Sequence, residues 1–178
     1  MPALTPDELQ AFLVEPGHLL RLATIDEDGF PRVVPIWFVH EKGRLLFTLR
    51  SAAVPLANIR RDPKVGLSID ETAHPYRKIT VRGVVEIVHE AGQDDAWRDT
   101  YRTIAKRYTP DAWADSYVDA TTEQPRPLLG VDLGASTTAL STWRMPATAE
   151  EAPSGIWASR YYTPETDLRA VDSRLRGG

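Results

Sequence analysis

Two short turns, Asp28-Gly29 and Lys42-Gly43, constrain the fold of this chain more than any other feature. They separate three apolar runs between residues 18 and 50 that are rich in Val, Ile, Leu and Phe. Residue pairs of this kind form tight hairpin turns between antiparallel strands. A short helical segment and two more strand-like runs follow before residue 89. Five strands with one helix inserted after the third predict a closed antiparallel barrel, which can hold a planar ligand at an open edge or at a dimer seam.

The apolar pattern also predicts where each element begins and ends. Strands are expected at 19–25, 32–39, 44–49, 65–69 and 77–88, with a final hairpin formed by 128–133 and 138–143. Helices are expected from the capping box Thr5-Pro6-Asp7-Glu8 to about residue 14, at 54–61, at 93–108, and from Thr109-Pro110-Asp111 to about residue 119. The aromatic and apolar stripe of the third helix, which includes Trp97 and Tyr101, is typical of a core face. These elements predict a mainly β fold with flanking helices.

Proline at position 35 lies inside the second predicted strand. It has no backbone N–H to donate to a neighbouring strand, so we expect this strand at a sheet edge or at a bulge. An open edge would offer backbone groups to a ligand. A bulge without a ligand is the alternative.

Composition places the chain in a broad class. Its 178 residues favour one domain, which we assign to residues 1–146 as a barrel with an N-terminal helix and two helices after the fifth strand. Residues 147–178 are expected to form an extension that packs on a partner subunit. The net charge of −4 provides no basic field for nucleic acid, and the absence of cysteine excludes disulfides and thiolate chemistry. No apolar run has membrane length, and residues 1–10 lack a signal-peptide pattern, so we expect a cytoplasmic protein.

Motifs that carry their own catalytic chemistry are missing from the sequence. There is no GxSxG, HExxH, P-loop or GxGxxG pattern. The four histidines, at positions 18, 40, 74 and 89, have no metal-ligand spacing, so no metal site is predicted and no catalytic residue is assigned. If the protein is an enzyme, we expect a cofactor to supply the reactive group and the protein to bind and orient it.

The order and spacing of several segments resemble one known family. They are Leu22–Ile25 followed by Asp28-Gly29, then Pro31–Trp37, Phe47–Arg50, Asn58–Val65 and Arg82–Glu86. Together they resemble the FMN-binding split β-barrel family related to pyridoxamine 5'-phosphate oxidase, over roughly residues 8 to 145. The resemblance implies a split β-barrel, a flavin or deazaflavin oxidoreductase, and a homodimer with the cofactor at its two-fold seam.

The loop after the third strand suits a phosphate group. Thr48, Arg50 and Ser51 supply hydroxyls and a guanidinium just before a helix N-terminus. An ordinary strand-to-helix loop is the alternative. In the family that this chain resembles, the same loop and helix hold the phosphate of FMN or of the deazaflavin coenzyme F420, and Thr48, Arg50, Ser51 and Asn58 match. The family commonly has a lysine where this chain has Pro55, which removes one cationic partner.

Two further groups of residues match the family's ring and tail contacts. Pro35, Ile36 and Trp37 match the segment that lies against the edge of the isoalloxazine ring. Trp143 matches a tryptophan near the cofactor, although both indoles could equally fill the core. Pro75-Tyr76-Arg77-Lys78 recurs in the deazaflavin branch, where Arg77 and Lys78 could attract an acidic tail, or could form a solvated strand start.

Three functions therefore stay open. The first is hydride transfer between coenzyme F420 and a small organic substrate. The second uses FMN, as in a pyridoxamine phosphate oxidase-like oxidase. The third is non-catalytic binding of a flavin, a deazaflavin or a tetrapyrrole.

Overall fold

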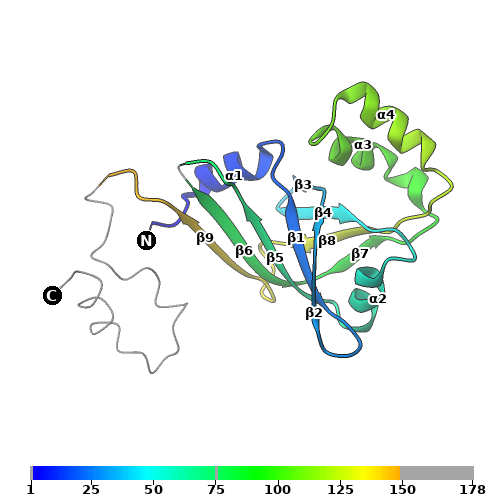
Figure 1. Ribbon diagram of the computed structural model, residues 1–178, viewed down its shortest axis with the longest axis horizontal. Helices are drawn as coiled ribbons and strands as arrows, with labels where there is room; N and C mark the ends of the chain where they lie inside the picture. Colours follow the sequence, from blue (N-terminus) through cyan, green and yellow to red (C-terminus); the bar gives the residue numbers. More distant parts are fainter. Residues whose placement is uncertain (1, 75, 149–178) are drawn as a thin grey trace.

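Nine strands form two antiparallel sheets within the residues that the computed structural model describes, 2–74 and 76–148 (Figure 1). The strands are β1 (Leu20–Ile25), β2 (Pro31–Ile36), β3 (Phe38–Glu41), β4 (Arg44–Thr48), β5 (Lys64–Asp70), β6 (Arg77–Val84), β7 (Glu86–His89), β8 (Leu128–Asp132) and β9 (Ala139–Arg144). One sheet has the order β2-β1-β5-β6-β9, and the other has the order β3-β4-β8-β7. The helices are α1 (Pro6–Val14), α2 (Val54–Arg61), the 3-10 turn η1 (Asp94–Ala96), α3 (Arg98–Lys106) and α4 (Asp111–Ala120). We predicted that residues 147–178 pack on a partner subunit. Residues 149–178 of this extension lie outside the described part of the chain.

Two predicted strands are each divided in the structure. The expected strand 32–39 breaks at Trp37 into β2 and β3, and the expected strand 77–88 breaks at Val85 into β6 and β7. At both breaks the chain leaves the five-stranded sheet and enters the four-stranded one, as strands do at the corners of packed sheets. The prediction of five barrel strands was therefore wrong in number, while the split β-barrel with flanking helices is confirmed. β2 is an edge strand, as Pro35 predicted.

The predicted final hairpin is not a hairpin. β8 pairs with β4 and β7, whereas β9 pairs with β6 in the other sheet. The two strands diverge because the chain between them crosses from one sheet to the other, close to β6. Gly83 permits this approach, since a Cβ at position 83 would lie 2.8 Å from the side chain of Val131.

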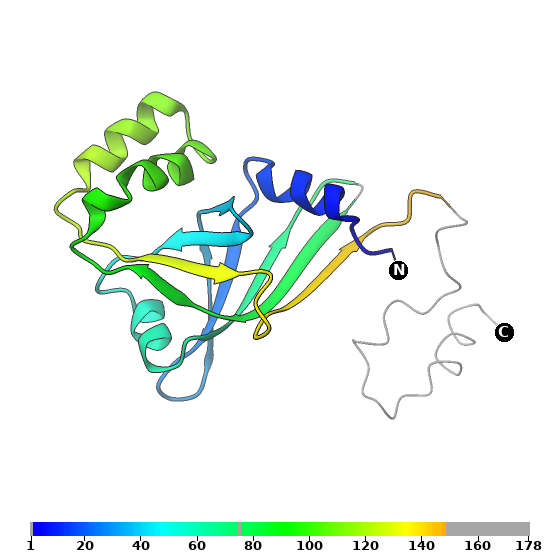
Figure 2. The same ribbon diagram turned by 180° about the vertical axis from the view of Figure 1, so that it is seen from behind.

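The buried side chains of the strands belong to two apolar cores. The larger core lies between the sheets and includes Phe47 of β4, together with Phe12 of α1 and Leu56 of α2. The smaller core lies on the outer face of the four-stranded sheet, on the side where α3 and α4 lie (Figure 2), and it includes Leu46 of β4. β4 and β8 are therefore buried on both faces. Among the described elements, none covers the outer face of the five-stranded sheet in the same way.

The helix ends follow the sequence with two differences. The capping box at Thr5 and Glu8 is confirmed. The predicted helix 93–108 is a 3-10 turn followed by α3, and the N-cap position of α4 is Pro110, which gives the helix no side-chain cap. The Thr109 hydroxyl does not cap α4 but donates to the Ala105 carbonyl at the end of α3. No helix in the described ranges has both the length and the apolar character needed to cross a membrane.

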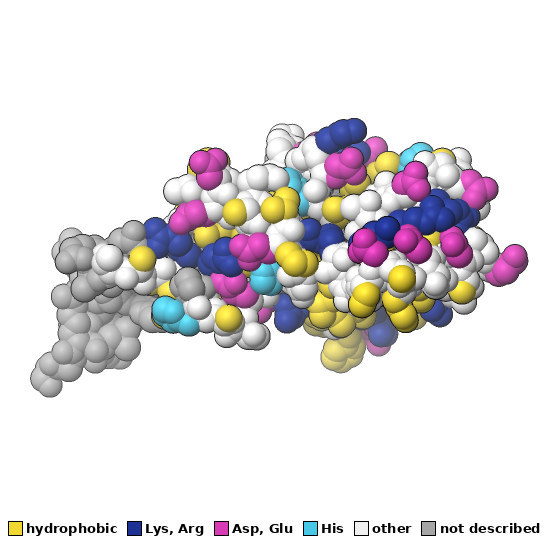
Figure 3. All heavy atoms as spheres, turned by 90° about the horizontal axis from the view of Figure 1, so that it is seen from above, with side chains coloured by type: hydrophobic (Ala, Val, Ile, Leu, Met, Phe, Trp, Pro, Cys, Tyr) yellow, Lys and Arg dark blue, Asp and Glu magenta, His cyan; other side chains and the backbone are white. Residues whose placement is uncertain are grey.

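Ion pairs hold α3 and α4 together at the surface. Arg102 of α3 contacts Asp115 and Asp119 of α4, and Lys106 also pairs with Asp115. Figure 3 shows Lys and Arg side chains flanked by Asp and Glu over this helix pair, on the right of the view. These contacts fix the helices over β3 and β4, where they form one wall of a cavity.

Candidate functional site

The break between β2 and β3 borders a cavity of about 220 Å³. We call it the bend pocket. It is lined by Pro35, Ile36 and Trp37 at the break, Thr48 at the end of β4, Tyr101 and Ile104 of α3, Tyr117 of α4, and Arg126 just before β8. Four residues that the sequence predicted as cofactor contacts, Pro35, Ile36, Trp37 and Thr48, are thus brought together in space.

The bend pocket has a rigid aromatic wall. The indole of Trp37 stacks on Tyr108, with ring centroids 5.3 Å apart and an interplanar angle of 5°. The Tyr108 hydroxyl donates to the His18 carbonyl at 2.8 Å and accepts from the Phe38 amide, which fixes the stack to the backbone. Tyr117 meets Trp37 edge-on at 6.0 Å. Such a wall suits a planar ligand, because aromatic side chains offer flat, well-oriented surfaces.

Positive charge gathers at the same pocket. Arg126 is 7 % exposed, and its guanidinium lies over the Tyr101 ring at 4.9 Å. Burial raises the pKa of Tyr101 to about 12. Burial acts in the same direction on Tyr117, but its interactions with Tyr101, Arg126 and Arg50 outweigh burial and hold the pKa of the Tyr117 hydroxyl below its usual value. The pocket therefore favours a negatively charged group.

The loop before α2 borders a second cavity of about 340 Å³, which includes Ser51, Asn58, Arg60 and Arg61 in its lining. The Thr48 hydroxyl donates to the Pro127 carbonyl at 2.9 Å, and the Ser51 hydroxyl donates to Pro125. Both hydroxyl oxygens can still accept a hydrogen bond.

Ala53, at the N-cap of α2, gives its helix no side-chain cap, and Arg50 is exposed. Because the Thr48 and Ser51 hydroxyls already donate their protons to carbonyls, a phosphate at the start of α2 would be held through cations such as the exposed Arg50 guanidinium.

Asn58, a predicted phosphate contact, has a different role in the structure. It is buried, and its amide nitrogen donates to Thr24 at 3.1 Å and to Asp26 at 2.7 Å. Its amide oxygen accepts from Arg61 at 3.2 Å. Hydrogen bonds from Arg32 and then from Asn58 hold the pKa of Asp26 below its ordinary value. Asn58 therefore braces the turn between β1 and β2.

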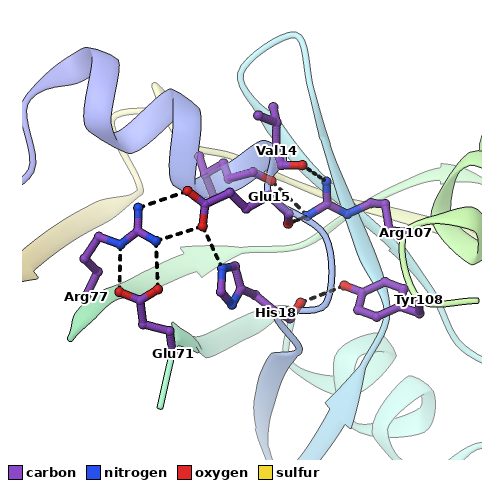
Figure 4. A network of polar contacts seen from close by, with 8 residues as sticks. Val14, Glu15, His18, Glu71, Arg77, Arg107 and Tyr108 are labelled. Atoms are coloured by element: carbon purple, nitrogen blue, oxygen red, sulfur yellow. Dashed lines mark hydrogen bonds and ion pairs between the residues drawn. The ribbon is translucent and has the colours of Figure 1, made fainter. Parts of the chain in front are cut away.

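Arg77, predicted to attract a coenzyme tail, lies in an ion-pair network (Figure 4). Its guanidinium donates to Glu71 at 2.7 Å and to Glu15 at 2.8 Å, and His18 also contacts Glu15 at 3.1 Å. Hydrogen bonds to Glu71 and Glu15 raise the pKa of Arg77, and Arg77 lowers the pKa of both acids. Glu15, His18 and Glu71 lie close enough together to bind a metal ion. The Arg77 guanidinium, however, pairs with both carboxylates and so already provides the positive charge that a metal ion would bring.

The same network fixes the end of α1. Arg107, just after α3, donates to the carbonyls of Leu13, Val14 and Glu15 at 2.8–3.0 Å. These carbonyls have no partners within the helix, so the arginine satisfies them. Arg77 and Arg107 thus join α1 to β6 and α3.

Lys78 and Trp143 face each other across β6 and β9. They are register partners, and the Lys78 ammonium lies 5.4 Å from the centre of the Trp143 ring. Trp143 also packs on Tyr76 at 5.3 Å. β9 is the edge strand opposite β2 in the five-stranded sheet, so Arg77, Lys78 and Trp143 do not join the bend pocket of their own chain.

Sequence reasoning missed four residues of the bend pocket. Tyr101 and Ile104 were interpreted as core, and both are buried in the smaller core as well as lining the pocket. Tyr117 gave no signal. Arg126 stands between Pro125 and Pro127, directly before the apolar run of β8. The sequence signal for Arg126 was a single cation directly before a buried strand.

Comparison with known proteins identifies the family. The model of the pyridoxamine 5'-phosphate oxidase family matches residues 5–133, so the chain belongs to that family. No curated protein matches the chain.

Solved structures share the fold. One described as an F420 reductase is 27% identical, with a TM-score of 0.54, and the match covers 72% of this chain and 93% of that one. The conserved hypothetical protein Rv2991 from Mycobacterium tuberculosis is 24% identical, with a TM-score of 0.59 and coverage of 83% and 92%. The heme storage protein HutZ from Vibrio cholerae is 19% identical, with a TM-score of 0.57 and coverage of 76% and 94%.

Proposed function

We propose that this protein is an oxidoreductase that uses coenzyme F420 or FMN to reduce or oxidise a small organic substrate by hydride transfer. The observation that carries the proposal is the bend pocket. The segment matching the family's ring contacts, Pro35 to Trp37, borders a cavity with an aromatic wall and a buried cation. The family membership and the 27% identity to an F420 reductase support the same reading.

The residues present fit such a cofactor in two places. Trp37 offers a fixed ring face, and β2, as an edge strand, has backbone groups directed away from β1. Arg50 and Ser51 lie at the start of α2, where a phosphate would be held. When bound, the flavin or deazaflavin ring would supply the hydride chemistry, and the protein would supply binding and orientation.

The choice between F420 and FMN rests on few residues. The similarity to an F420 reductase favours the deazaflavin. In the sequence, Arg77 favoured F420 because it could attract the acidic tail of that coenzyme. In the structure Arg77 is paired with Glu15 and Glu71, so it no longer favours F420 over FMN within one chain. Pro55 stands where the family commonly has a lysine, so one cationic contact to the phosphate of F420 or of FMN is missing.

Non-catalytic binding of a flavin, a deazaflavin or a tetrapyrrole is the second candidate. It is supported by the lack of any assigned catalytic side chain and by the shared fold with a heme storage protein. However, the bend pocket, whose lining is fully described, contains no histidine that could bind a heme iron. This observation favours the oxidoreductase.

A fluorescence titration of the purified protein with F420 and with FMN tests the proposal. We expect saturable binding of one of them, followed by turnover in steady-state assays with nitroaromatic, enone or pyridoxamine-like substrates. Binding without turnover would support the binding protein. Binding of neither cofactor would overturn the oxidoreductase and the flavin- or deazaflavin-binding protein, and a tetrapyrrole titration would then test the remaining candidate.

We further propose that the protein is a homodimer that uses the outer face of its five-stranded sheet. Val33, Ala23, Gly66, Arg82 and Ala139 form one register row across this face. Ala23, Gly66 and Ala139 are small, and they contribute to a shallow hollow of about 630 Å³ that is mostly apolar but is also lined by Arg82 and Lys64. A second copy would cover this surface, and a residue of one protomer could then complete the site of its partner.

A further inference from the structure

The two residues that follow α3 hold the loop between α1 and β1, residues 15–19 (Figure 4). Arg107 donates to the last carbonyls of α1, and its own carbonyl accepts from the Gly17 amide at 3.2 Å. Tyr108, the next residue, donates its hydroxyl to the His18 carbonyl at 2.8 Å. Residues 107 and 108 thus fix the backbone of the α1–β1 loop along most of its length.

Tyr108 also reaches the bend between β2 and β3. Its hydroxyl oxygen accepts from the Phe38 amide at 3.2 Å, and its ring stacks on Trp37 with centroids 5.3 Å apart. Burial raises the pKa of Tyr108, so the hydroxyl keeps the proton that it donates to His18. One side chain therefore connects the α1–β1 loop to the indole that borders the bend pocket.

The indole of Trp37 is surrounded by rings that differ in how firmly they are held. Tyr117 and Trp113 of α4 meet it edge-on, with centroids 6.0 Å and 6.4 Å away, and Trp113 is 50 % exposed. Tyr108 instead covers a face of the indole and is hydrogen-bonded to the backbone of two other segments. A functional side chain keeps its orientation when its packing partner is itself fixed by hydrogen bonds. Tyr108 is such a partner for Trp37.

We propose that Tyr108 is a positioning residue of the cofactor site, whose hydroxyl sets the orientation of the Trp37 indole by tying it to the α1–β1 loop. The inference rests on the proposed function and deepens it, because Tyr108 lies outside the lining of the bend pocket. The orientation of Trp37 can be measured without any cofactor. A failure of this inference is therefore distinguishable from a failure of the proposed oxidoreductase activity.

The first test follows the indole N–H signals of the full chain by NMR, without cofactor. The chain has five tryptophans, and the signal of Trp37 is the one that Trp37→Ala removes. Tyr108→Phe keeps the stacked ring and removes the hydroxyl, so the Trp37 signal should shift, or broaden through exchange between orientations on the microsecond to millisecond timescale. Thr109→Val is the matched control. It removes a hydroxyl that donates to the Ala105 carbonyl at the same end of α3, and it should leave the Trp37 signal unchanged.

The second test is a double-mutant cycle on the affinity for the tighter of F420 and FMN. Tyr108→Phe should weaken binding by about three- to tenfold, the loss expected for one hydrogen bond. In the Trp37→Ala background the same change should have no further effect, because the hydroxyl acts through the indole. Thr109→Val should bind as the wild type does. A merely structural role of Tyr108 would instead weaken binding equally in both backgrounds.

Two results would overturn the inference. One is an unchanged Trp37 signal in Tyr108→Phe, and the other is equal weakening of cofactor binding with and without Trp37. If neither cofactor binds, the Trp37 signal alone decides the role of Tyr108, while the proposed oxidoreductase fails separately.

Gly17→Ala provides the test from the other side if Tyr108→Phe fails to fold. Gly17 has a φ of +87° and open space around its Cβ position, so alanine strains the loop backbone without a clash. The strain should displace the His18 carbonyl from Tyr108 and change the Trp37 signal. A folded Gly17→Ala with the wild-type Trp37 signal would contradict the coupling.

Discussion

Arg50 is an exposed cation that interacts with Tyr117 of the bend pocket and lies just before Ala53, the N-cap of α2. If it contacts the cofactor phosphate, Arg50→Ala should weaken cofactor binding by about 1.5–3 kcal/mol. Thermal stability without cofactor should barely change, because the side chain is exposed. Arg44→Ala, at the opposite end of β4, is the control and should leave the affinity unchanged. Equal affinities of Arg50→Ala and the wild type would support an ordinary solvated loop.

Pro55 stands at the position where the family commonly has a lysine. The structure changes the expected effect of Pro55→Lys on stability. From the sequence, a lysine in the first turn of α2 should cost only the helix-dipole term of about 0.3–1 kcal/mol. Pro55 is buried, however, so Pro55→Lys would also bury an ammonium group and should cost more. Val54, next to it, is 49 % exposed and offers a better position for the cation.

Val54→Lys should therefore lose about 0.3–1 kcal/mol of unfolding free energy when empty, yet bind a phosphorylated cofactor more tightly. Urea denaturation and cofactor titration measure the two effects. Val54→Gln controls for the loss of the valine. Unchanged or weaker binding of both cofactors by Val54→Lys would show that the phosphate does not lie beside α2.

At the scale of elements, Arg77 links α1 to β5 and β6 through Glu15 and Glu71, and this link should depend on pH. Hydrogen bonds from Arg77 hold the pKa of both acids below 4.5. Because the folded-state pKa values are depressed, their contribution to stability is complete above pH 4.5 and is lost as the pH falls through the lower values.

Arg77→Met should remove part of that acid sensitivity. We expect the wild type to lose more unfolding free energy than the variant between about pH 6 and about pH 3.5, measured by urea denaturation. Arg44→Met, which removes an exposed pair with Glu86, should keep the wild-type slope. Identical slopes for the wild type and Arg77→Met would contradict the role given to this network.

Local sequence signals predicted most elements, and long-range pairing accounts for the errors. The capping box, the glycine turns and the edge position of β2 depend on a few neighbouring residues, so they could be predicted. The breaks at Trp37 and Val85 and the separation of β8 from β9 depend on where two sheets meet. A local sequence pattern does not predict where two sheets will contact each other.

The candidate site divides in the same way. Pro35 and Trp37 could be located by resemblance because they are contiguous in the chain. Arg126 could not, since its role follows from burial beside residues that are distant in sequence. Asn58 and Arg77 matched a family pattern, yet their side chains are used within the fold.

At the scale of the whole molecule, the uncovered sheet face predicts a dimer. Val33 is 60 % exposed and lies in the register row that crosses this face. Val33→Glu should shift the protein toward monomer in sedimentation at micromolar concentration, because it places a charge in an apolar interface. Val14→Glu, at a similarly exposed position on α1, should stay dimeric. A wild type that sediments as a monomer would exclude the dimer and any composite site.

The central claim is that a flavin or deazaflavin ring lies against Trp37 at the bend between β2 and β3. The most direct measurement compares the affinity of the tighter cofactor for the wild type, Trp37→Ala and Trp97→Phe, a control in the smaller core that does not line the bend pocket. We predict that Trp37→Ala binds roughly tenfold more weakly, as expected from the loss of an aromatic contact, and that Trp97→Phe binds as the wild type does. Equal affinity of Trp37→Ala and the wild type would contradict the claim.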